Sequence, residues 1–166
     1  MNLQHTIEQL YELPAGTAGR DDAFHAVEQL KQLLNRGDVR AAEQDADGWR
    51  VNTWVKKGIL LAFRIGALTG AQPRYDGFRF FDKDTMTLRN FTVADGVRIV
   101  PGGSAVRDGS FLGRGVVMMP PSYVNIGAYV DGQTLIDSHA LVGSCAQIGR
   151  RVHCSAAAQI GGVLEP

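Results

Sequence analysis

The sequence predicts a mainly β protein, in which a parallel β-helix of hexapeptide repeats follows a small α/β N-terminal domain. Two observations lead to this prediction. Residues 1–111 carry 28 of the 34 charged residues, both tryptophans and all seven phenylalanines, so the composition changes along the chain. An apolar residue then recurs at every sixth position between residues 100 and 160. We therefore expect an N-terminal domain over residues 1–98 and a β-helix over residues 99–166, incomplete at its C-terminal end.

Two helices are predicted at the start of the chain. The first is indicated by four apolar residues at helical spacing before the break at Pro14–Gly16, namely Leu3, Ile7, Leu10 and Leu13. The second has an apolar face of four residues, namely Phe24, Val27, Leu30 and Leu34. Asp21 or Asp22 would cap this second helix, and Gly37 would end it.

The remaining part of the N-terminal domain mixes strands with a third helix. Residues 39–52 contain the turn-prone sequence Asp45–Gly48 between two short segments, which predicts a hairpin. Thr53 would cap an apolar helix with the sequence WVKKGILLAFRIGAL. Residues 70–98 are expected to form a connector with short strands.

The β-helix prediction depends on the six-residue period. Eleven positions in steps of six are all apolar: Val100, Val106, Leu112, Met118, Val124, Val130, Ile136, Val142, Ile148, Cys154 and Ile160. At the apolar content of this chain, a fixed phase would give this result by chance with a probability on the order of 10⁻⁴. Four residues after each of these positions, the side chain is small or compact in ten cases. This pattern is typical of hexapeptide β-helices, in which three hexads form one triangular coil.

Coil geometry predicts which polar residues share a face, because residues 18 apart stack on neighbouring coils. Asp131 and Asp137 are six apart and should therefore lie on different faces, which disfavours a paired carboxylate mechanism. Gly143 and Gly161 are 18 apart, and their backbone amides would be open to an extended ligand. Fewer than four coils fit into residues 100–166.

Charge and composition exclude several classes of function. The 17 basic residues balance the 17 acidic ones, so no general electrostatic binding of nucleic acid or of an anionic membrane is expected. The N-terminus lacks the pattern of a signal peptide, and no apolar run is long enough to span a membrane, so we expect a cytoplasmic protein. The spacing of His139 and His153 does not match the zinc-binding histidines of γ-type carbonic anhydrases, and no metal is predicted. Neither Cys145 nor Cys154 is expected to be a nucleophile.

Several blocks of the sequence resemble the tetrahydrodipicolinate N-succinyltransferases. The resemblance is strongest from Tyr123 to Pro166, where it includes the blocks MPPSYVNIGAYVD and GSCAQIG. It extends to WRVNTWVKKGILLAFRIG, from Trp49 to Gly66, and to GVRIVPGGSAVRDG, from Gly96 to Gly109. The resemblance implies a left-handed β-helix. It also implies a homotrimer with active sites between subunits, which transfers succinyl from succinyl-CoA to the amine of tetrahydrodipicolinate or of its open 2-amino-6-oxopimelate form.

Site residues follow from the same resemblance. The catalytic aspartate of the family corresponds to Asp137 in LIDSHALVG, and the arginine that binds a substrate carboxylate corresponds to Arg98 in VRIVPG. Independently of the resemblance, backbone amides around Gly143 and Ser144 are candidates for stabilising the tetrahedral oxyanion, and Gly143, Ser144 and Gly161 are the candidate contacts of the CoA co-substrate. Succinyl-CoA would be a co-substrate, and no permanently bound cofactor is implied.

Each of these assignments has a simpler alternative. Asp137 would be a solvated turn residue and Arg98 a partner in a structural ion pair. The chain as a whole would be a related hexapeptide acyltransferase that uses acetyl-CoA or another amine acceptor, or an inactive trimeric scaffold.

Outward apolar residues that would favour a trimer are Met119, Tyr123 and Tyr129.

Overall fold

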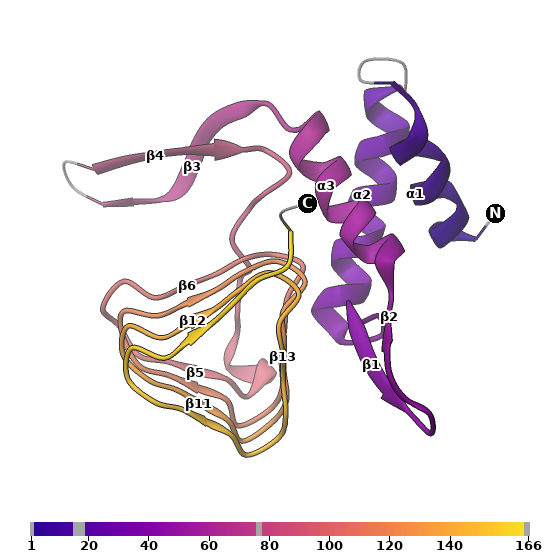
Figure 1. Cartoon of the computed structure of the whole chain (residues 1–166). Coiled ribbons are helices and arrows are strands. Elements are labelled where there is room, and N and C mark those ends of the chain that lie inside the picture. The colour runs from indigo at the N-terminus through magenta and orange to yellow at the C-terminus, as the bar shows by residue number, and fades with distance from the viewer. Residues whose placement is uncertain (1, 15–18, 76–77, 165–166) are drawn as a thin grey trace.

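The protein consists of a three-helix cluster beside a stack of triangular coils. The computed structural model of the chain describes residues 2–14, 19–75 and 78–164. A long hairpin projects from the region between the two parts, and the C-terminal end of the coils returns towards the helices (Figure 1). None of the helices among the described residues is long and apolar enough to cross a membrane.

The helices are α1 (Leu3–Glu12), α2 (Arg20–Arg36) and α3 (Thr53–Ile65). They pack through fully buried aliphatic side chains, among them Ile7, Val27, Leu30, Val55, Ile59 and Leu61. Gly58 marks the closest approach of α3 to α2, because a Cβ atom there would lie 2.4 Å from a methyl of Leu30. Apolar spacing therefore predicted the helices and most of the residues that they bury. Leu13 is an exception, because it follows the last residue of α1 and is exposed.

Both predicted N-terminal helix caps were wrong. Helix α2 begins after Gly19, so Asp21 and Asp22 lie in its first turn and not at the cap. Negative side chains in that turn are favourable because they face the free amide groups of the helix end. Helix α3 is preceded by Asn52, and Thr53 is its first residue. Gly37 ends α2 with a φ of 74°, as predicted.

Two antiparallel hairpins complete the N-terminal part. Strands β1 (Ala42–Asp45) and β2 (Gly48–Val51) form the hairpin predicted from the Asp45–Gly48 turn. Strands β3 (Leu68–Tyr75) and β4 (Phe78–Lys83) form a second and longer hairpin, where short connecting strands were expected. A short 3₁₀ helix, η1 (Val93–Asp95), precedes the coils.

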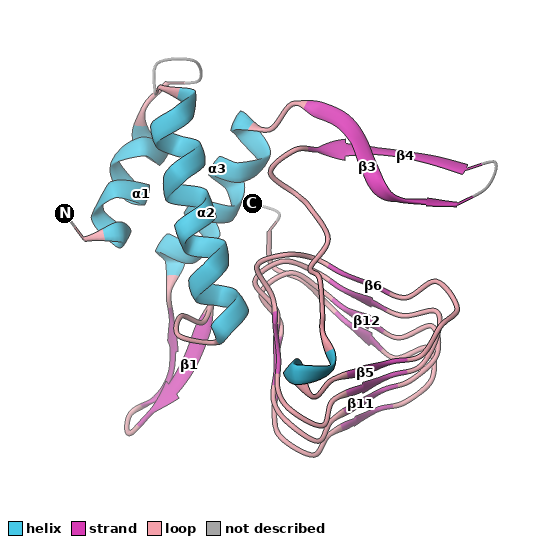
Figure 2. Cartoon of the chain, turned by 180° about the vertical axis from the view of Figure 1, so that it is seen from behind, coloured by secondary structure: helices cyan, strands magenta, loops and turns pink. Residues whose placement is uncertain are grey.

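Residues 98–160 form eleven two-residue strands joined by corners. The strands are β5 (Arg98–Ile99), β6 (Ala105–Val106), β7 (Phe111–Leu112), β8 (Val117–Met118), β9 (Tyr123–Val124), β10 (Tyr129–Val130), β11 (Leu135–Ile136), β12 (Leu141–Val142), β13 (Gln147–Ile148), β14 (His153–Cys154) and β15 (Gln159–Ile160). They stack into three parallel sheets, which form the sides of a prism (Figure 2). We name them the first face (β5, β8, β11, β14), the second face (β6, β9, β12, β15) and the third face (β7, β10, β13). These stacked coils fit the predicted left-handed parallel β-helix.

The second residue of each strand points into the prism, and this produces the six-residue period. Met118, Val124, Val130, Ile136 and Val142 are fully buried there. One member of the predicted column is wrong, because Ile99 and not Val100 pairs with Met118 in the first coil. The segment between β5 and β6 is one residue longer than the other corners, so the separation of the paired residues is 19 instead of 18.

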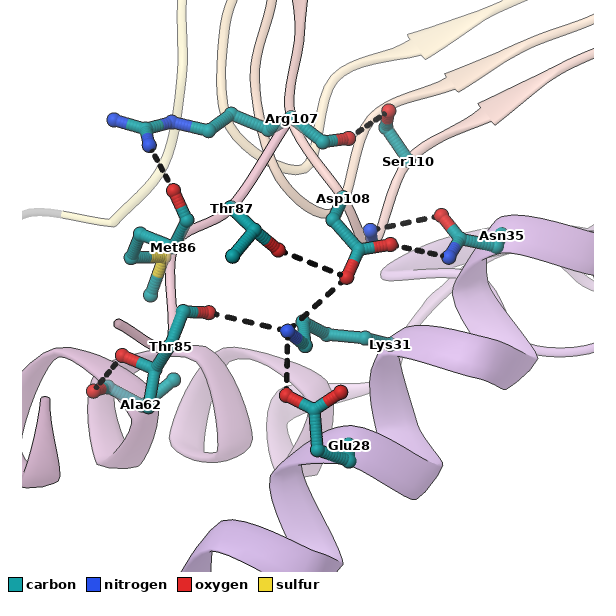
Figure 3. Close-up of polar contacts among 11 residues, drawn as sticks. Glu28, Lys31, Asn35, Ala62, Thr85, Met86, Thr87, Arg107, Asp108 and Ser110 are labelled. Carbon is teal, nitrogen blue, oxygen red and sulfur yellow. Dashed lines mark hydrogen bonds and ion pairs between the residues drawn. The ribbon is translucent and has the colours of Figure 1, made fainter. Parts of the chain in front are cut away.

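A buried polar cluster joins the helices to the coils (Figure 3). Lys31 of α2 is only 2% exposed, and its Nζ lies 2.5 Å from Glu28 Oε1 and 3.1 Å from Asp108 Oδ2. It also donates to the carbonyl of Thr85 at 3.3 Å. Asn35 donates to Asp108 Oδ1 at 2.5 Å. We call these five residues the docking cluster. It connects helix α2, the segment after β4 and the corner after β6.

The segment after β4 also covers the first strand of the second face. The amide of Arg89 donates to the carbonyl of Val106, and the amide of Asp108 donates to the carbonyl of Thr87. The guanidinium of Arg107 reaches the carbonyl of Met86. This segment thus occupies backbone groups that would otherwise be unpaired at the N-terminal edge of the coil stack.

We expect Lys31→Met to lower the free energy of unfolding by about 2–4 kcal/mol, because it leaves two carboxylates without their buried cation. Urea denaturation would measure the loss. Lys57→Met is the matched control, since Lys57 forms an ion pair with the exposed Glu12 at the surface and its loss should destabilise the chain much less. Equal losses in both variants would contradict a structural role for the docking cluster.

Candidate functional site

Asp137 lies on the first face, directly after β11, with both carboxylate oxygens engaged. Its Oδ1 accepts a hydrogen bond from the amide of Ser138 at 2.7 Å, and its Oδ2 lies 3.4 Å from Nε2 of His153. The Ser138 amide, followed by His153, holds the pKa of this carboxyl below its usual value. Since the folded pKa is depressed, the ionised group stabilises the fold above its unfolded pKa, and this contribution is lost as the pH falls through the folded value.

Part of this arrangement is a general feature of the corners. Asn125 Oδ1 accepts from the amide of Ile126 at 2.8 Å, and Asp131 Oδ1 accepts from the amide of Gly132 at 2.6 Å. Asn125, Asp131 and Asp137 each follow the inward residue of a strand, and each accepts a hydrogen bond from the next amide. They therefore stabilise their corners in the same way. What distinguishes Asp137 from the other two is its second contact, with a histidine of the next coil.

The structure places Arg98 on the same face as Asp137. Arg98 stacks in register with Val117, Leu135 and His153. Its guanidinium is exposed, with Nη2 4.0 Å from Sδ of Met119, and it makes no ion pair among the described residues. Asp137 lies two coils further along. At the usual strand spacing this separates the two residues by about 10 Å along the prism.

The predicted thioester-binding residues lie at a different corner. Gly143 and Ser144 follow β12, between the second and third faces, and Gly161 follows β15. The amide of Gly143 donates to the carbonyl of Ile160 at 2.8 Å, so it belongs to the ladder between coils. A Cβ atom at Gly143 would lie 2.4 Å from the amide nitrogen of Gly162, which shows that the glycine allows two coils to approach closely.

Ser144 is buried at this corner, and its neighbour Cys145 packs against the apolar cluster of the helices. Gly161, in contrast, has open space where a side chain would be. The structure thus brings Arg98 and Asp137 together on one face and separates them from Gly143, Ser144 and Gly161. Binding of the thioester at this corner stays a prediction.

The outward apolar residues do not form one patch. Met119 follows a strand of the first face, Tyr123 lies on the second face and Tyr129 on the third. Tyr129 is also used within the chain, because its ring stacks on Phe111 with a centroid distance of 4.6 Å and lies under the guanidinium of Arg40.

Sequence reasoning missed the contact between His153 and Asp137, since it considered this histidine only as a zinc ligand. The signal was present in the coil period. His153 stacks directly on Leu135, which lies two positions before Asp137. The side chains of His153 and Asp137 therefore project from the same part of the first face.

Comparisons with known proteins agree with the fold and with the motifs. Residues 2–65 match the sequence model of the N-terminal domain of tetrahydrodipicolinate N-succinyltransferases. Over 99% of its length, the chain is 44% identical to a 2,3,4,5-tetrahydropyridine-2,6-dicarboxylate N-succinyltransferase of Bradyrhizobium diazoefficiens, and it covers 60% of that protein. It is 46% identical to the enzyme of the same name from Polynucleobacter asymbioticus, covering 98% of the chain and 61% of the relative.

Fold and sequence first define the chain as a protein of the hexapeptide-repeat β-helix class. Within that class its sequence is similar to the tetrahydrodipicolinate N-succinyltransferases over nearly its whole length, as its motifs had indicated. The chain spans about 60% of the length of the relatives that it matches.

We expect both cysteines to react slowly in the folded chain. Burial raises the pKa of Cys145 to about 11 and raises that of the buried Cys154 as well. At pH 8, about one Cys145 thiol in a thousand would be ionised, and the thiolate is the reactive form. A thiol-reactive dye should therefore label the native chain far more slowly than the urea-unfolded chain. Equally fast labelling of both would contradict the burial of these thiols.

Proposed function

We propose that this chain carries the amine-activating face of a CoA-dependent N-succinyltransferase. It would transfer succinyl from succinyl-CoA to the amine of tetrahydrodipicolinate, in its cyclic or open 2-amino-6-oxopimelate form. The observation that carries this proposal is the placement of Arg98 and Asp137 on one face of the prism. The names of the relatives support the acyl group and the acceptor.

The chemistry of the transfer requires a carboxylate next to the amine. The amine nitrogen forms a bond to the thioester carbon, the C–S bond breaks, and CoA leaves as a thiolate that takes up a proton. Asp137 would orient the amine and accept the proton that it loses. The carboxyl group is ionised at neutral pH, as a proton acceptor must be.

Arg98 would hold one carboxylate of the acceptor. A guanidinium binds a carboxylate through two parallel hydrogen bonds, which fixes both the position and the orientation of the substrate. The separation of about 10 Å from Asp137 suits an elongated acceptor that has its amine at one end and a carboxylate at the other. The exposed guanidinium has no carboxylate partner among the described residues, so this role does not compete with a structural ion pair.

The assembly belongs to the proposal as well. We propose a cytoplasmic homotrimer with its active sites between neighbouring subunits, in which a second subunit covers the first face. The small-molecule substrates would be its ligands. Gly143, Ser144 and Gly161 remain the proposed contacts of the CoA thioester.

Asp137→Asn should lower the rate of acceptor-dependent thiol release from succinyl-CoA at least about 100-fold, because a general base typically contributes this much or more. L-2-aminopimelate is a suitable stable amine acceptor for the assay. Asparagine keeps the acceptor oxygen for the amide of Ser138, and Asn125 shows that the corner accommodates this residue. The variant should therefore fold normally.

Asp131→Asn is the matched control, since it changes the same kind of corner on another face and should leave the rate within about twofold. Acetyl-CoA, assayed in parallel, identifies the acyl donor. If the reaction is faster with acetyl-CoA, the chain is an acetyltransferase and the proposed succinyl transfer is wrong. A stable oligomer that shows no affinity for either CoA ester in calorimetry would favour the scaffold function.

A further inference from the structure

We infer that His153 is a positioning residue for Asp137, which holds the carboxylate in the orientation that the transfer requires. This inference rests on the proposed function, because it assigns a role within the same reaction. It derives from a side-chain contact between two coils and not from the motif that identified Asp137.

The coil stack brings the two side chains together. Strand β14 pairs with β11 in parallel register, so His153 lies beside Leu135 on the first face. Asp137 leaves the same face two residues later, and its backbone amide donates to the carbonyl of Cys154. The imidazole Nε2 is then 3.4 Å from Oδ2 of the carboxylate. Backbone hydrogen bonds therefore fix both ends of this contact.

The contact leaves the carboxylate able to bind a substrate. A carboxylate accepts about four hydrogen bonds, and only two of these positions are taken by the Ser138 amide and by His153. The side chain of Asp137 is 30% exposed and that of His153 is 58% exposed, so an amine can approach from the open side. Contacts on both oxygens favour one orientation of the carboxylate.

Other titratable groups near the pair do not supply the same contact. His139 lies at the same corner as Asp137, but its side chain is exposed and makes no hydrogen bond or ion pair among the described residues. Met119 is the residue of the preceding coil that stacks on Asp137, and it carries no charge. Arg98 is a further coil away. Among the residues described, His153 is the titratable side chain that lowers the pKa of Asp137.

The first test compares His153→Ala with His139→Ala in the thiol-release assay. His139→Ala is a matched control, because Ala157 occupies the equivalent position of the next coil with nearly the same positive φ, 61° against 62°. We expect His153→Ala to lower kcat about five- to twentyfold, with the KM for succinyl-CoA changed less than about twofold. His153→Gln, which retains an N–H donor, should recover part of the loss. The His139→Ala variant should stay within about twofold of the unchanged chain.

The second readout is the pH profile. Removing the imidazole should raise the pKa of Asp137, so the acid limb of kcat/KM moves to higher pH in His153→Ala. In a chain that already carries Asp137→Asn, the His153→Ala change should have no further effect, because the histidine acts through that carboxylate. A loss of equal size with and without Asp137, or an unchanged acid limb, would overturn the inference.

Failure of the proposed function has a separate signature. NMR titration of the Asp137 carboxyl group measures its pKa without any turnover, and this pKa should rise in His153→Ala because one of the contacts that lower it is lost. If the titration shows this coupling but the unchanged chain releases no thiol with either CoA ester, the proposed function fails and the contact is structural only. If the chain turns over but the pKa of Asp137 does not respond to His153→Ala, the positioning role is wrong and the function stands.

Discussion

Hydrogen bonding between successive coils is the constraint on which the rest of the structure depends. Each strand contains only two residues, so it is stable only as one rung of a ladder in which the amides of one coil donate to the carbonyls of the next. The ladder fixes residues 18 apart on top of one another. This geometry buries the aliphatic column inside the prism, and it places the outward side chains in rows. The candidate site spans neighbouring rows of the first face: Arg98 and His153 lie in one row, and Asp137 lies two residues after Leu135 of that row.

Docking of the helices onto the coils is a second and different kind of constraint. The coil ladder is made of backbone groups and is tolerant of sequence, whereas the docking cluster depends on particular charges. Lys31 is buried between two carboxylates from different parts of the chain, and such an arrangement is stable only while all partners are present. Because the cluster and the aromatic stack of Phe111 and Tyr129 both lie towards the helices, the first face remains free of the N-terminal domain.

The periodic parts of the structure were predictable from the sequence, and the parts set by single contacts were not. Six-residue spacing gives the coils and their inward column, since it reflects the repeating geometry itself. It failed at Val100, where one extra residue shifts the register before the second coil. The same spacing also identified the rows of outward side chains, but not which of these side chains touch. The contact of His153 with Asp137 joins positions 16 apart, and the docking of Lys31 onto Asp108 joins two domains, so neither leaves a local pattern. Asp137 and Arg98 were found through resemblance and not through spacing.

In the function that we propose, the first face of the prism receives the amine acceptor. NMR of the isotope-labelled chain during titration with L-2-aminopimelate tests it directly, because it locates binding without requiring turnover. We expect the signals of Arg98, Asp137 and His153 to shift together and to saturate at the same concentration, while those around Gly143 stay unchanged. Shifts confined to the corner around Gly143 and Gly161, with the first face unaffected, would contradict it.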